Sequence, residues 1–136
     1  MLDLSHLPVV DVHCHPFANA GPVTAEQFVD MVAFPGGGVA YMAEAGLPAD
    51  AALAREIQDI RRDTVYMRYL VRRIAHLFDC EPEIEAVVAA RNRAVTVDYA
   101  GYVSRLFAAV GLAGLVVEIG YPRPPLAVAD FRADMP

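Results

Sequence analysis

Two histidines one residue apart, His13 and His15, are the residues of this chain whose types and spacing are best suited to chemistry. They end an apolar stretch that begins at Val9 and has the composition of a strand. Because side chains alternate between the faces of a strand, both imidazoles share a face with Asp11, and Cys14 points to the other face. Paired neutral imidazoles suit a divalent metal, with Zn²⁺ expected first and Mn²⁺ or Fe²⁺ as alternatives. We therefore predict that His13 and His15 are metal ligands; the alternative is a surface pair that makes only local hydrogen bonds.

A single carboxylate, that of Glu118, interrupts a second apolar stretch near the end of the chain. At the C-terminal end of a parallel strand, this carboxylate would lie on the same rim as the two histidines. There it could bind a substrate or support a metal ligand from behind. An equally supported interpretation is a carboxylate that reaches solvent or pairs with an arginine. The sequence alone assigns no catalytic residue.

The remaining candidates favour structural roles. Cys14 is expected to be a packed thiol, and His76 is expected to lie on the face of a helix. The glycines at 36–38 lack the Gly-Lys-Ser/Thr of a phosphate loop, so no cofactor-binding residue is predicted. Three residues at helical spacing are expected to pack in the interior: Tyr66, Met67 and Tyr69. Two arginine pairs, at 61–62 and 72–73, are expected to be solvated and balanced by nearby carboxylates.

Composition limits the classes of function. The chain has 136 residues, 56% of them hydrophobic and 21% charged, which is typical of a globular protein. Its net charge is −6 and all eleven basic residues are arginine, so we predict no nucleic-acid partner and no catalytic lysine. No apolar run reaches the roughly 18 residues of a membrane span, and because residues 1–5 have no basic stretch followed by an apolar one, we predict no signal peptide. Two cysteines make no disulfide framework, so a cytoplasmic location is expected.

The elements that must position these residues follow from apolar periodicity and from breaking residues. A strand is predicted first and another near the end, with helices between them. Because both strands are almost wholly apolar, we expect a parallel sheet covered on both faces. The predicted helices span residues 24–34, 50–79, 82–92 and, capped by Thr96, 96–111.

Residues 9–15 (VVDVHCH) and 118–122 (EIGYP) resemble two motifs of the amidohydrolase superfamily, in its amidohydrolase-related branch of metal-dependent hydrolases. The resemblance implies an α/β fold, namely the N-terminal portion of a (β/α)₈ TIM barrel with a large helical insertion between strands 1 and 2. A complete barrel needs about 250 residues, so this barrel would be incomplete. The implied organisation is a single partial domain over residues 1–136. Its parts are strand 1 at 8–15, the insertion at 16–111, strand 2 at 112–122 and the start of a next segment at 123–136.

The resemblance also implies an activity. A metal-activated water would attack the C–N or C–O bond of an amide, ester or lactone in a small-molecule substrate, with His13 and His15 as ligands. The family's later histidines and its aspartate have no counterpart in this sequence, so we expect the 136-residue chain alone to lack meaningful activity. Two alternatives remain open: a decarboxylase (a lyase) of the same superfamily, and a non-enzymatic helical interaction module. Unpaired strand edges also allow a homo-oligomer.

Overall fold

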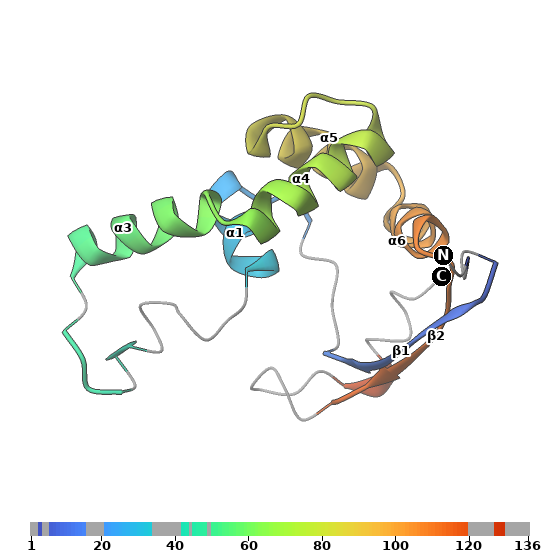
Figure 1. The fold of residues 1–136 in the computed structure, drawn as a ribbon, viewed down its shortest axis with the longest axis horizontal. Helices are drawn as coiled ribbons and strands as arrows, with labels where there is room; N and C mark the ends of the chain where they lie inside the picture. Colours follow the sequence, from blue (N-terminus) through green and yellow to red (C-terminus); the bar gives the residue numbers. More distant parts are fainter. Residues whose placement is uncertain are drawn as a thin grey trace. The chain divides into compact units, whose positions relative to one another are not determined.

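The computed structural model describes residues 3, 6–15, 21–33, 42–43, 45–48, 50–119 and 127–129. These ranges contain five helices between two strands (Figure 1). The chain divides into two compact units, which we call the sheet unit (Met1–Pro22 with Arg93–Pro136) and the helical unit (Val23–Asn92). The elements, in order, are β1 (Val9–Cys14), α1 (Ala25–Val32), α3 (Ala51–Arg62), α4 (Val65–Phe78), α5 (Ile84–Val97), α6 (Tyr99–Ala109) and β2 (Leu112–Val117).

In the sheet unit, β1 and β2 pair in parallel. Val9 is opposite Leu112 and Cys14 is opposite Val117, with irregular register between these ends. Gly111 has a φ of 63°, a left-handed conformation that glycine adopts without strain, and it links α6 to β2 directly. Parallel strands need a long connection, and the segment that contains the helices provides it between β1 and β2.

The prediction of a barrel is wrong for this chain. The described residues form a two-stranded sheet and five helices, not a series of strands that alternate with helices. The expectation that both faces of the sheet are covered is also wrong, because Val10 is 56% exposed, Val12 74% and Val116 56%. Apolar, β-branched residues favour an extended backbone whether or not another layer covers them. The composition of the two strands therefore predicted the strands correctly and the number of layers around them incorrectly. Of the second motif, residues 118–122, the last three residues (Gly120, Tyr121 and Pro122) lie outside the described residues.

The helical unit has its own hydrophobic core, to which α1, α4 and α5 contribute. Met67, Val71 and Ala75 are buried at four-residue steps along α4, the spacing that places side chains on one face of a helix. Met67 is only 1% exposed, as expected for a packing residue. The buried cluster consists of Phe28, Val29, Met67, Val71, Ala75, Ile84, Val87 and Val88.

The long helix predicted over residues 50–79 is broken into α3 and α4. The first helix ends at Arg62 with Asp63 as its C-cap, and Thr64 begins the second helix as its N-cap, because its side chain accepts a hydrogen bond from Met67 N. Similarly, α6 is capped by Asp98 and not by Thr96, which lies inside α5. None of the helices in the described ranges is long and apolar enough to cross a membrane.

Side-chain contacts hold the start of α1 in the helical unit. Thr24 and Gln27 form the predicted capping box, in which each side chain accepts a hydrogen bond from the backbone N–H of the other. On α5, the Asn92 amide accepts from Val23 N (3.0 Å) and donates to Val23 O (2.8 Å). These bonds tie two segments far apart in sequence to one another.

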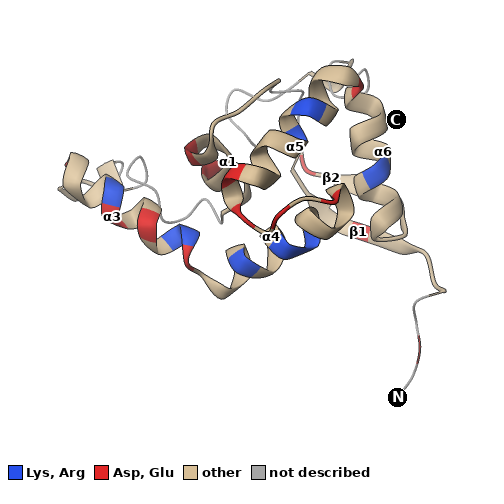
Figure 2. Cartoon of the chain, turned by 90° about the horizontal axis from the view of Figure 1, so that it is seen from above, with Lys and Arg blue, Asp and Glu red and all other residues tan. Residues whose placement is uncertain are grey.

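Ion pairs join helices of the helical unit. Figure 2 marks the positions of the charged residues along the ribbon. Arg61 pairs with Asp30 of α1 at 2.9 Å, and Arg62 pairs with Glu85 of α5. The arginines at 61 and 62 are therefore balanced by carboxylates of other helices, where the sequence pattern had pointed to neighbouring acids. The arginines are half-buried but the carboxylates are exposed to solvent, so each pair contributes little stability, roughly 0–1 kcal/mol.

Candidate metal centre

The end of β1 places two imidazoles side by side. His13 lies within the strand and His15 directly follows it. Their ring centroids are 5.4 Å apart and the ring planes are inclined by 74°. The alternation of side chains along the strand thus brings the two histidines together, as predicted.

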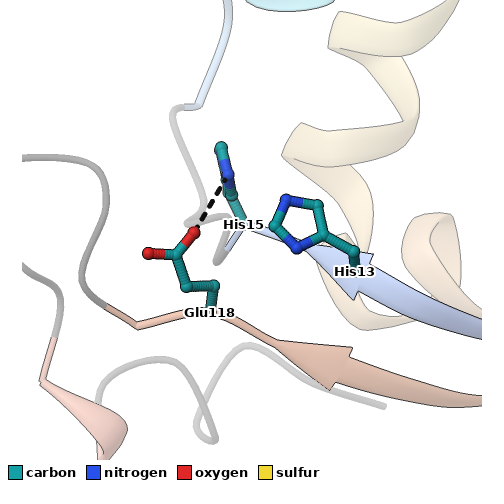
Figure 3. A group of neighbouring side chains, drawn as sticks. All are labelled: His13, His15 and Glu118. Atoms are coloured by element: carbon teal, nitrogen blue, oxygen red, sulfur yellow. Dashed lines mark ion pairs between the residues drawn. The ribbon is translucent and has the colours of Figure 1, made fainter.

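Strand pairing brings a carboxylate to the same place. The backbone N–H of Glu118, directly after β2, donates to Cys14 O at 2.9 Å. This bond sets the Glu118 side chain beside the end of β1, with its Oε2 3.5 Å from His15 Nε2. Figure 3 shows the three side chains grouped together: His13 comes from β1, His15 directly follows β1, and Glu118 directly follows β2.

Two further residues of β1 support this arrangement. The Asp11 carboxylate accepts a hydrogen bond from the backbone N–H of His13 at 3.1 Å, which fixes the backbone that carries this ligand. Cys14 Sγ points away and donates to Val116 O at 3.7 Å. Burial raises the pKa of the Cys14 thiol, and the negative charge of Asp11 raises it further. Cys14 is therefore a half-buried thiol that is protonated at neutral pH and points away from the histidines, as the sequence interpretation expected for its direction.

The donor atoms fit a single metal ion in type and in spacing. One nitrogen from each histidine and one Glu118 oxygen all lie within 4.8 Å of one another. Around a tetrahedral Zn²⁺, with bonds of about 2.0–2.1 Å, neighbouring donors lie about 3.3 Å apart. The 3.5 Å between His15 Nε2 and Glu118 Oε2 is close to this spacing.

The sequence left two interpretations of Glu118 open: a substrate-binding or supporting carboxylate, and one that reaches solvent or pairs with an arginine. The structure places Glu118 in the group of candidate ligands. Knowledge of the register of the two strands would have identified Glu118 as a candidate ligand, because the register sets residue 118 beside the end of β1. His76 lies on the exposed face of α4, in the helical unit. The glycines at 36–38 lie outside the described residues.

Comparison of the chain with models of protein families, with curated proteins and with solved structures finds no significant match. The resemblance to amidohydrolases therefore stays a prediction that rests on its two short motifs.

Proposed function

We propose that this protein binds one divalent metal ion through His13, His15 and Glu118, and that the metal serves the hydrolysis of an amide, ester or lactone in a small molecule. The observation that carries the proposal is the closeness of the three donor atoms, within 4.8 Å of one another. Two histidines and a glutamate are a ligand set of catalytic zinc sites, which keep a fourth position for water. Mn²⁺ and Fe²⁺ also suit these donors, so zinc is the first metal to test.

The chain's own residues hold this site and leave it open. Asp11 and the backbone of Cys14 fix the segments that carry the ligands. The side chains of His15 and Glu118 are 41% and 54% exposed, so a small substrate has access from solvent. A divalent metal bound there would act as a Lewis acid and lower the pKa of a coordinated water to about 7.

Calorimetric titration with Zn²⁺ tests the binding. The wild-type chain should bind, and His15→Ala or Glu118→Gln should weaken binding by more than about 100-fold, because even residues behind metal ligands typically contribute 10–100-fold. Glu81→Gln, a change at an exposed carboxylate of the helical unit, should leave the affinity unchanged. Equal affinities in all four proteins would refute the assignment of ligands.

Hydrolysis needs a separate test. The expectation of an inactive chain was based on two ligands, and the third candidate ligand removes part of that argument. We expect the zinc-loaded chain to hydrolyse an activated ester such as p-nitrophenyl acetate slowly, and the His13→Ala/His15→Ala variant to lose this activity. A rate that is the same with and without these histidines would refute the hydrolytic role and leave metal binding to be judged by calorimetry.

We also infer a reducing, cytoplasmic location. Cys14 and Cys80 are free thiols, which supports this inference because proteins of oxidising compartments commonly pair such residues. Mass measurement of the protein from its native cells should find both thiols unmodified.

A further inference from the structure

The exposed side of α4 combines arginines with large aromatic and apolar side chains. With 100° between successive residues, its exposed residues fall within one arc of about 160°. The opposite side carries Met67, Val71 and Ala75 into the core. We call the seven exposed residues Val65, Tyr66, Arg68, Tyr69, Arg72, Arg73 and His76 the α4 face.

The charge of the α4 face is opposite to that of the chain. The net charge of the chain is −6, yet α4 has no acidic residue. In Figure 2 the charged positions of α4 are blue, the colour of arginine, and its other residues are tan. Arg68 pairs with Asp63 just before the helix, at 2.9 Å. Arg72 and Arg73 form no ion pair with any residue in the described ranges. Two positive charges on one face are therefore available to an outside partner.

Large apolar and aromatic groups accompany these charges. Val65 is 85% exposed, Tyr66 56% and Tyr69 62%. The two tyrosines were expected to pack in the interior, and this expectation is wrong: the helix turns Met67 inward and both tyrosines outward. Tyrosine and arginine are the residues most enriched, with tryptophan, at the energetic centres of protein interfaces.

A hollow borders one side of the α4 face. It has a volume of about 410 Å³, and its lining includes Arg68 and Arg72 of α4 together with the carboxylates of Asp63, Glu83 and Glu85. Arg62 also lines it and is held by its ion pair with Glu85. Arginines and carboxylates are equal in number on its lining, so the positive charge of the α4 face comes from Arg72 and Arg73, and the hollow adds a space beside Arg72 that a bulky side chain can enter.

We propose that the α4 face is a docking site for an acidic, amphipathic segment of a partner protein. Carboxylates of the segment pair with Arg72 and Arg73, and its apolar side chains contact Val65, Tyr66 and Tyr69. Three kinds of anionic partner are possible: an acidic protein segment, a nucleic acid and an anionic membrane. The charges around the α4 face favour the acidic protein segment. A continuous phosphate backbone or an anionic membrane would meet Glu83, Glu85 and the net charge of −6 beside the arginines, whereas a short segment contacts the arginines alone. This inference is independent of the metal centre, which lies in the other unit.

Fluorescence anisotropy with a labelled synthetic peptide, in which glutamates alternate with leucine and phenylalanine, tests the proposal on the full chain. The peptide should bind, more weakly as salt rises, and Arg72→Glu/Arg73→Glu should weaken binding by at least about tenfold. Tyr66→Ala/Tyr69→Ala should also weaken it. Arg55→Glu/Arg93→Glu makes the same change of charge at exposed positions outside the α4 face and should have little effect. Circular dichroism confirms that each variant is folded.

Three outcomes would overturn the proposal. One is equal binding of the peptide in which lysine replaces glutamate, since charge would then not select the partner. Another is an equal loss in the Arg55→Glu/Arg93→Glu variant, since the effect would then be one of net charge. The third is that the peptide fails to bind, or that single-stranded RNA or phosphatidylserine vesicles bind the α4 face more tightly than the peptide does.

Discussion

Two residues of the metal centre, His13 and Glu118, are held by a hydrogen bond of their own backbone N–H. Asp11 holds the backbone N–H of His13, and the bond from Glu118 N to Cys14 O joins the ends of the two strands. The ligands are therefore exposed side chains on a backbone that is fixed locally. Such an arrangement can bring donor atoms together without a deep pocket. The side chains then adjust to their final bond distances when the ion binds.

The thiol of Cys14 gives a prediction at the residue scale. Its raised pKa, caused first by burial and then by Asp11, reduces the thiolate fraction at neutral pH. Because the thiolate is the nucleophile, iodoacetamide should alkylate Cys14 more slowly than a free cysteine. Asp11→Asn removes the negative charge and lowers this pKa, so alkylation should become faster, by less than about tenfold.

The rate is measured by mass spectrometry in a Cys80→Ser background, which leaves one thiol. Asp59→Asn, a change of an exposed carboxylate on α3, is the matched control and should leave the rate unchanged. A rate that Asp11→Asn does not alter would show that Asp11 has no influence on the thiol.

At the scale of the elements, local signals predicted where helices begin better than how long they run. The capping box at Thr24 correctly predicted the start of α1. The apolar periodicity of residues 50–79 predicted one helix, although Thr64 caps a second helix within that range. For α6 the cap is Asp98, where the sequence predicted Thr96. Caps compete within a few residues of one another, and the packing of the helices, which the sequence does not show, decides between them.

Asn92 gives a prediction at this scale. Its amide makes two hydrogen bonds to the backbone of Val23, and Asn92→Ala would leave both Val23 groups without these bonds. We expect the free energy of unfolding to fall by about 1–3 kcal/mol. Denaturation with urea measures this change, and Arg93→Ala, at the neighbouring exposed position, should change the value by no more than about 0.5 kcal/mol. Equal stability of Asn92→Ala and the wild type would show that water replaces these bonds without cost.

At the scale of the whole molecule, the core and the metal centre belong to different units. The sequence predicted the order of strands and helices and the parallel pairing, because a long crossover leaves little other choice. It failed for the fold class, because apolar strands such as β1 were assumed to be covered and Val12 is exposed. How many layers surround a strand depends on long-range packing that no local pattern records.

The core of the helical unit gives a prediction at this scale. Met67 is 1% exposed and packs within the cluster formed by α1, α4 and α5. Met67→Ala should lower the free energy of unfolding by about 2–5 kcal/mol through lost burial and the cavity that remains. His13→Ala, at an exposed position, should lower it by no more than about 0.5 kcal/mol without metal. A small effect of Met67→Ala would mean that the cluster is loosely packed.

The most direct test of the central claim is the zinc content of the chain after equilibrium dialysis against a low concentration of Zn²⁺. A site made by His13, His15 and Glu118 predicts about one zinc ion per chain in the wild type. It predicts essentially none in the His13→Ala/His15→Ala variant and a strongly reduced content in Glu118→Gln. Equal zinc contents in the wild type and these variants, or no zinc in any of them, would contradict the account.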